Sequence, residues 1–366
     1  MKIGKIRNIE IKLNISTLFI IALIGYYAAT TYYSLSSGHI SLLELFLVGI
    51  INGIILMFSI FLHELMHSFV AQHYGITVKE IELHLFGGVS RMLEEPRTPK
   101  AEFYISGVGP LTSLTIGLAS ILFNFLPLGF PNFIRFTLFY SGISNIILGL
   151  FNLIPAFPMD GGRVLRSILW RKRNNLISAT KTASNIGVAF GYFFIGLGFV
   201  DIIISGLISG LWLVFIGFYI ISAARGAFTQ SVYDFKLSNI NARQLTRIPR
   251  VFIPYNMSLE EAVLRYFMPY SYTYFPVIDG GLIVGIVHIN DIRKIPVYMR
   301  NRVIIGDIMR PISYFPIVSE EQSGRDIVRV LNEIKEGPQI LLVEDENDRL
   351  IGFISLEDVL SSLKFI

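Results

Sequence analysis

The chain divides into two parts by the pattern of its apolar positions. Long uncharged runs fill the first two thirds, whereas Asp and Glu become frequent in the last third. A helix that crosses a bilayer needs about 20 mostly apolar residues. Runs close to that length predict six transmembrane helices, at residues 15–33, 42–74, 103–126, 133–153, 184–204 and 207–224. Between the second and third of them, residues 78–92 are rich in β-branched residues and contain a Gly pair, which predicts a strand or hairpin.

The last third contains an internal repeat. Residues 285–292 (GIVHINDI) align with residues 352–359 (GFISLEDV), and each copy follows a short apolar strand and precedes a helix-like segment. Such a repeat indicates two α/β units that pack as a pair. The predicted architecture is therefore a polytopic α-helical membrane domain with a small β element, residues 1–228, followed by a soluble α/β pair, residues 229–366, with copies at 237–299 and 302–366.

Basic residues lie beside the apolar runs. They precede the first span, separate the second from the third and follow the fourth, whereas the loops at 34–39 and 127–132 carry no Lys or Arg. Because basic loops stay on the cytoplasmic side, we expect a multi-pass protein of the cell membrane, in the lipid bilayer, with both termini in the cytoplasm. The net charge of +4 is modest and forms no stripe, so nucleic acid is not an expected partner.

The sharpest motif is His63-Glu64-Leu65-Met66-His67, inside the second predicted span. Two His at positions i and i+4 share one helix face and can bind one metal ion, with Glu64 beside them as a base. The chain has no Cys, so thiolate metal sites and disulfides are excluded. Burial of three ionisable residues in an apolar span is costly without a function, so we interpret them as a Zn²⁺ site.

A catalytic zinc needs a third protein ligand, and Asp160 is the candidate. It lies in the segment NLIPAFPMDGGR at residues 152–163, just after the fourth span. Spans two and four run in the same direction, so their ends reach the same side of the membrane. Pro155 and Pro158 interrupt the helix and allow the chain to turn back toward the metal. The alternative is that Asp160 only caps a helix at 161–170.

The pair of motifs resembles the site-2 protease family of intramembrane metalloproteases over residues 15–224. The resemblance implies that His63, His67 and Asp160 bind one catalytic zinc ion and that Glu64 is the general base. It also implies that Asn152 is catalytic, close to the scissile carbonyl. The implied reaction is hydrolysis of peptide bonds in or near the transmembrane segments of a membrane-protein substrate.

Two further segments bear on this resemblance. Residues 106–110 match the Gly part of a family motif, but Ser113 stands where Asn is common, and this departure weakens only the assignment of a supporting polar contact to that position. Residues 83–91 resemble the membrane-inserted β element of the family, which can pair with an unwound substrate strand.

The repeat in the tail resembles tandem cystathionine-β-synthase-type (CBS) domains. Such pairs commonly bind adenine nucleotides, so the resemblance implies ATP, ADP or AMP as a regulatory ligand. The second copy keeps the family's Ser and Asp as Ser355 and Asp358, whereas the first keeps Asp291 with His288 at the Ser position. Asp291 and Asp358 are the candidates for ribose contacts and Ser355 for a phosphate. A pairing module without a ligand is the alternative, and a homodimer through these domains is also compatible with the sequence.

Two other functions fit parts of the sequence. A membrane transporter regulated by the CBS pair is one, but the spans show no convincing inverted repeat. An inactive homologue that shelters client helices is the other, and the intact His63, Glu64, His67 and Asp160 argue against it.

Overall fold

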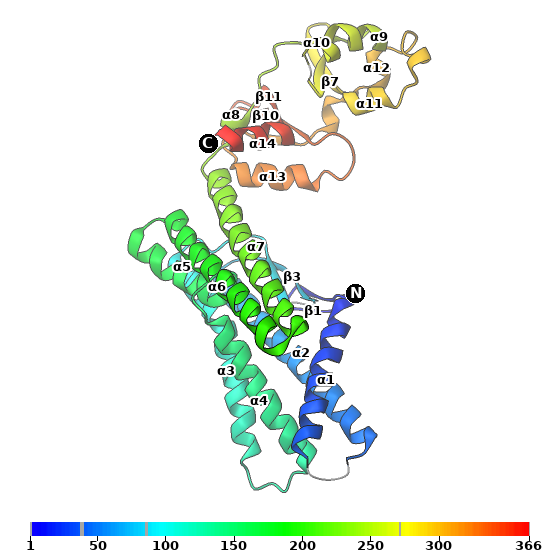
Figure 1. The fold of residues 1–366 in the computed structure, drawn as a ribbon. Helices are drawn as coiled ribbons and strands as arrows, with labels where there is room; N and C mark the ends of the chain where they lie inside the picture. Colours follow the sequence, from blue (N-terminus) through cyan, green and yellow to red (C-terminus); the bar gives the residue numbers. More distant parts are fainter. Residues whose placement is uncertain (1, 37–39, 85–86, 271, 366) are drawn as a thin grey trace. The chain divides into compact units, whose positions relative to one another are not determined.

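The chain is described by a computed structural model that covers residues 2–36, 40–84, 87–270 and 272–365. It divides into two compact units, residues 1–230 and 231–366, and the division falls inside one long helix (Figure 1).

Long helices build the first unit, and among the described residues six helices are long and apolar enough to cross a membrane. They are α1 (Ser16–Leu35), α2 (Leu42–His73), α3 (Pro99–Asn124), α4 (Asn132–Asn152), α6 (Leu176–Ser205) and α7 (Leu207–Ser238), with the shorter α5 (Asp160–Arg173) between α4 and α6. The six predicted spans are confirmed. Helices α6 and α7 extend past their predicted apolar cores, because polar residues continue the helix beyond the stretch that hydropathy detects.

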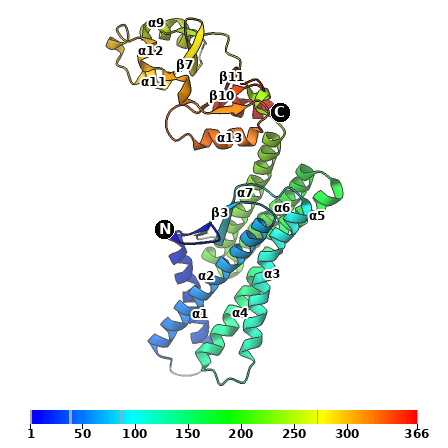
Figure 2. The same cartoon turned by 180° about the vertical axis from the view of Figure 1, so that it is seen from behind.

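Close helix contacts in this unit depend on glycine. A Cβ on Gly117 of α3 would lie 2.7 Å from the carbonyl oxygen of Gly142 in α4, and a Cβ on Gly25 of α1 would lie 2.7 Å from that of Gly49 in α2. Small residues let the backbones of membrane helices approach closely, where association depends on packing. Helices α3 and α4 accordingly lie side by side in both views (Figures 1 and 2).

A four-stranded sheet lies at one end of the helices. Its order is β1 (Lys2–Ile6), β2 (Ile9–Leu13), β3 (Val78–His84) and β4 (Gly87–Met92), with β2 and β3 parallel and the other pairs antiparallel. The predicted hairpin at 78–92 is confirmed as β3 and β4, while residues 85 and 86 lie outside the described part. The sequence reading missed β1 and β2, because it interpreted their basic residues only as flanks of the first span.

The segment between α4 and α5 turns the chain sharply. Helix α4 ends at Asn152, and the backbone then passes through Pro155 and Pro158 before α5 begins at Asp160. A Cβ on Gly161 would lie 2.3 Å from the carbonyl oxygen of Leu153, so this turn requires glycine. The structure therefore confirms the predicted interruption of the helix by proline.

The second unit contains two sheets. One has the order β5 (Ile253–Pro254), β6 (Tyr274–Asp279), β7 (Leu282–His288) and β8 (Arg310–Pro311); the other has β11 (Leu350–Ser355), β10 (Ile340–Glu344) and β9 (Ile317–Ser319). The helices are α8 (Ala242–Leu245), α9 (Leu259–Ala262), α10 (Met268–Tyr270), α11 (Ile289–Arg293), α12 (Ile305–Ile308), α13 (Gly324–Glu333) and α14 (Leu356–Phe365), with a π-helical turn at Val263–Phe267 and 3₁₀ turns at Val297–Met299 and Ile312–Tyr314.

The strand registers bear out the predicted repeat. Gly285 of β7 pairs with Val277, and Gly352 of β11 pairs with Val343, and each ladder shifts register immediately after its Val. Residues 253–305 contribute one buried core, residues 237–245 pack with residues 318–359 in a second, and a third cluster includes Tyr274, Ile286 and Phe353. The two copies therefore form one α/β pair, as predicted.

Candidate active site

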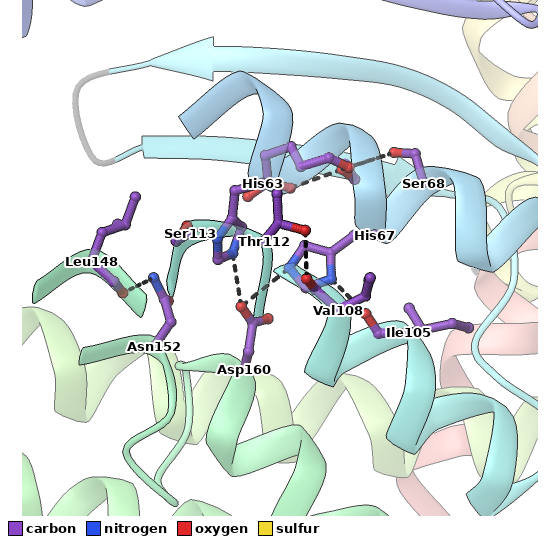
Figure 3. Close-up of polar contacts among 12 residues, drawn as sticks. His63, His67, Ser68, Ile105, Val108, Thr112, Ser113, Leu148, Asn152 and Asp160 are labelled. Carbon is purple, nitrogen blue, oxygen red and sulfur yellow. Dashed lines mark hydrogen bonds and ion pairs between the residues drawn. The ribbon is translucent and has the colours of Figure 1, made fainter. Parts of the chain in front are cut away.

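The two histidines of α2 face the first residue of α5. The Nε2 atoms of His63 and His67 lie 3.0 and 3.1 Å from Oδ2 of Asp160 (Figure 3). Both histidines are buried, and one ligand atom from each of the three residues lies within 4.8 Å of the others. The structure thus brings together residues that are 93 and 97 positions apart in the sequence.

The remaining nitrogens of the two rings are also engaged. Nδ1 of His67 lies 2.5 Å from the carbonyl oxygen of Ile105, and Nδ1 of His63 lies 2.9 Å from Oγ of Ser113 (Figure 3). A carbonyl oxygen only accepts, so Nδ1 of His67 carries a hydrogen, and in the neutral imidazole the lone pair is then on Nε2. Such outer contacts orient histidines that bind metals. Ser113, which stands where the family commonly has Asn, therefore makes a polar contact to His63 from α3.

Gly109 of α3 leaves room for the paired imidazoles. A Cβ at this position would lie 2.2 Å from Nε2 of His67 and 2.6 Å from Nε2 of His63. Any side chain here would occupy the space into which both lone pairs point. Within the Gly motif at residues 106–110, Gly109 is therefore required because a larger residue would clash with the imidazoles.

Glu64 lies against the β element. Oγ of Ser90, on β4, lies 2.8 Å from Oε2 of Glu64, and Oγ of Ser68 donates to the Glu64 backbone carbonyl at 2.9 Å. A Cβ on Gly88 would lie 2.3 Å from Cγ of Glu64, so the strand passes close to this side chain. The sequence reading missed Ser90, although its place in the predicted hairpin and the resemblance of that hairpin to a substrate-binding element were available signals.

Asn152 lies in the same region at the end of α4 (Figure 3). Its Nδ2 donates to the carbonyl oxygen of Leu148 at 2.9 Å. An amide has two hydrogens on this nitrogen, so one of them remains for another acceptor.

The donor set fits zinc. Two imidazoles and one carboxylate are a known arrangement for a catalytic ion, which also keeps an open position. Asp160 is the first residue of α5, the cap position is Met159, and no side chain caps this helix. The carboxylate faces the imidazoles, so the alternative that Asp160 merely caps the helix does not describe this structure.

A buried ion pair connects the two helices that complete the site. Arg166 of α5 donates to Glu102 of α3, with its Nε 2.5 Å from Oε1, and the two residues are 3% and 0% exposed. The guanidinium also lies over the ring of Phe157 at 5.4 Å. This pair fixes the helix of Asp160 against the helix of Gly109 and Ser113. The sequence reading did not find it; the signal was a Glu at the start of the third apolar segment.

The predicted nucleotide residues have structural partners in the second unit. Ser355 and Asp358 cap the start of α14: the Asp358 backbone N–H donates to Oγ of Ser355 at 3.2 Å, and Oδ2 of Asp358 accepts from the Ser355 backbone N–H at 3.0 Å. Asp291 pairs with Lys294 at 2.8 Å and Arg310 at 3.2 Å. Against the opposing effect of burial, these cations hold the pKa of Asp291 below its ordinary value.

Two hollows of about 480 Å³ each lie in the second unit. The first is lined by Arg247, Arg250, Tyr272 and Tyr274, and Arg247 lies 3.6 Å from Asp358 and 4.7 Å from the ring centre of Tyr272. The second is lined by Tyr314, Lys335 and Glu336, among others.

Comparison with known proteins gives matches along the whole chain. The model of peptidase family M50 matches residues 52–130 and 128–195, and that of the CBS domain matches residues 242–298 and 305–364. The zinc metalloprotease MJ0392 of Methanocaldococcus jannaschii is 31% identical over 371 residues, which cover 100% of this chain and 96% of the relative.

Two further matches cover different shares of the chain. Rip3 of Mycobacterium tuberculosis, whose name also describes a zinc metalloprotease, is 28% identical, with 98% of this chain and 91% of the relative covered. The solved site-2 protease from Methanocaldococcus jannaschii is 29% identical, with 62% of this chain and 94% of that one covered and a TM-score of 0.43. The match to MJ0392 covers both proteins almost completely. The chain therefore belongs to peptidase family M50, the site-2 proteases, and is a multi-pass zinc metalloprotease with a tandem pair of CBS domains.

Proposed function

We propose that the chain is an intramembrane endopeptidase in which His63, His67 and Asp160 hold the zinc ion. The observation that carries this assignment is the approach of both Nε2 atoms to one carboxylate oxygen, with both Nδ1 atoms engaged elsewhere. When bound, zinc acts as a Lewis acid that activates water and polarises the scissile carbonyl.

The other residues have separate tasks in this proposal. Glu64 takes the proton of the attacking water, and Ser90 holds the Glu64 carboxylate through the contact at 2.8 Å. The second amide hydrogen of Asn152 is available to the oxygen that becomes negative during attack. Ser113 and the carbonyl oxygen of Ile105 keep the two imidazoles in place.

The proposed substrate is a transmembrane segment of another membrane protein. Peptide bonds in a membrane helix are hydrogen-bonded within the helix, so the segment must unwind before cleavage. Strand β4 is the last strand of its sheet and has one neighbour, β3, among the described residues. An unwound segment can add to this edge, and Gly88 and Ser90 would bring it beside Glu64.

We further propose that both termini lie in the cytoplasm. The basic loops motivate this orientation, and α5, which begins at the site residue Asp160, ends in the basic residues Arg171, Lys172 and Arg173. Water for hydrolysis would then reach the zinc site from the cytoplasm.

Adenine nucleotide is the proposed ligand of the CBS pair and a regulator of cleavage. Support comes from the first hollow, where Arg247 and Arg250 suit phosphate groups and Tyr272 offers a face on which a base can stack. Ser355 and Asp358 would contribute from its border, although each already holds the start of α14. A homodimer through these domains stays a prediction.

Substitution of the base tests the catalytic assignment. Purified Glu64→Gln is expected to retain zinc and to lose cleavage of a transmembrane substrate, because the ligands are intact and the proton acceptor is gone. Cleavage by Glu64→Gln at a rate close to that of the wild type would refute the role of Glu64.

Calorimetry of the full-length protein with ATP, ADP and AMP tests the nucleotide proposal. Arg247→Gln is expected to weaken binding, whereas Arg243→Gln, which removes an exposed charge paired with Glu320 at 3.4 Å, is the matched control. Absence of heat with all three nucleotides, or equal weakening in both variants, would contradict the assignment.

A further inference from the structure

An apolar groove runs along α3 in the first unit and takes no part in the proposed chemistry. It has a volume of about 540 Å³ and is lined from the ends of α2 and α4, from α3 and from α5. Its lining includes Tyr74, Phe103, Tyr104, Gly107, Leu111 and Leu114. Phe103, Tyr104 and Leu111 are 42%, 51% and 62% exposed, so the groove has an open side.

A basic hollow continues the groove at one end. It has a volume of about 560 Å³, shares Phe103 and Tyr104 with the groove, and is lined by Lys100 of α3 and by Arg171 and Lys172 of α5. Among the described residues, none of these three cations forms an ion pair. An apolar channel therefore leads into a site with three unneutralised positive charges.

The dimensions of the groove decide what it can hold. Phe103 and Leu114 are eleven residues apart on one helix, which corresponds to about 16 Å. One leaflet of a hydrocarbon core is about 15 Å thick. A single acyl chain that extends along one leaflet therefore matches the groove in length.

We propose that this groove binds an anionic phospholipid. The acyl chain lies along Phe103, Gly107 and Leu111, and the phosphate lies among Lys100, Arg171 and Lys172. Burial of a hydrocarbon chain supplies the apolar part of the binding, and basic pockets between membrane helices recognise acidic headgroups. The same geometry distinguishes this ligand from a free phosphate, which would use only the basic hollow.

Spin-labelled lipids test the proposal directly. The full-length protein is reconstituted in phosphatidylcholine vesicles with traces of phosphatidylglycerol or phosphatidylcholine labelled on the acyl chain, and the motionally restricted fraction is measured by electron paramagnetic resonance. For the wild type we expect phosphatidylglycerol to be restricted several-fold more than phosphatidylcholine. Equal fractions for the two lipids would overturn the proposal.

Two variants separate the headgroup from the chain. Lys100→Gln/Arg171→Gln/Lys172→Gln should abolish the preference, whereas the control Lys5→Gln/Lys79→Gln/Arg135→Gln removes three charges elsewhere in the unit and should keep it. Gly107→Leu should displace both labelled lipids, because a Cβ at Gly107 meets nothing within 4 Å and the larger side chain can enter the groove without a clash.

The remaining outcomes count against the proposal. Equal loss of preference in both charge variants would mean that general surface charge is responsible. If Gly107→Leu leaves the restricted fraction unchanged and instead raises the KM for a transmembrane substrate, the groove belongs to the substrate. Melting curves like that of the wild type show that the variants are folded, so each result bears on binding.

Discussion

The substitution Gly109→Ala is expected to disable the active site, although it changes none of the proposed zinc ligands. In Gly109→Ala the new Cβ would lie 2.2 Å from Nε2 of His67 and 2.6 Å from Nε2 of His63, whereas ordinary contacts begin at 3.4 Å. The rings cannot simply rotate away, because Ser113 and the carbonyl oxygen of Ile105 hold their Nδ1 atoms. One or both Nε2 atoms must therefore shift by roughly 1 Å.

The size of the effect follows from that shift. Misplacement of catalytic groups by 1 Å can cost about 100-fold in rate, which equals about 2.7 kcal/mol of transition-state stabilisation. We expect kcat/KM of Gly109→Ala to fall by about 100-fold or more and its zinc content to fall as well, since the lone pairs no longer converge.

The assay compares cleavage of a transmembrane substrate in proteoliposomes with the metal content of the same preparation. Gly196→Ala in α6 is the control, because it also adds a methyl group to a glycine in a membrane helix and its Cβ meets nothing within 4 Å. If Gly109→Ala keeps its zinc and cleaves within about threefold of the control, the steric reasoning is wrong.

Three further predictions concern contacts around the site and the sheet. Ser90→Ala should lower kcat by about 10-fold or more, with KM and zinc content nearly unchanged. The reason is that a hydrogen bond to the charged Glu64 contributes about 1.5–3 kcal/mol. An unaltered pH profile of kcat would exclude this positioning role. Glu102→Gln should lower the free energy of unfolding by about 3–5 kcal/mol, because it leaves the buried Arg166 without its main charge partner, and a melting temperature equal to that of the wild type would contradict it. The hydrogen bond and charge of Lys12 hold the pKa of Glu80 below its ordinary value of 4.5, so this carboxylate stabilises the sheet at neutral pH. Glu80→Gln should therefore destabilise the protein at pH 7, and the difference should shrink as the pH falls below about 4.5; a difference independent of pH would refute this linkage.

The sequence predicts those features that repeat or that have few physical alternatives. Six apolar runs can only be satisfied by helices in lipid, so their number follows from hydropathy. The internal repeat fixes the α/β pair, because equivalent glycines pair with equivalent valines in the two ladders. The convergence of Asp160 on the two histidines was predicted from the proline turn and from the need of zinc for a third ligand.

Other features depend on contacts between distant parts of the chain, which no local sequence pattern predicts. Ser113 contacts His63 because α3 packs against α2, where Gly109 leaves room for the two imidazoles. Strands β1 and β2 are only five residues long each, and β2 is held in the sheet by its parallel partner β3. Ser355 and Asp358 carry a family pattern, yet their hydrogen bonds show that the same two side chains also cap a helix.

The central proposal is that two imidazoles of α2 and the carboxylate of Asp160 bind one zinc ion. Zinc K-edge X-ray absorption on the purified full-length protein measures that ligand set directly. The prediction is a first shell of nitrogen and oxygen only, with two imidazole rings at about 2.0–2.1 Å and carboxylate or water oxygen at about 2.0–2.2 Å, and with the shell altered in Asp160→Ala. A protein that contains no zinc, or a spectrum that shows no paired imidazoles and does not change in Asp160→Ala, would contradict it.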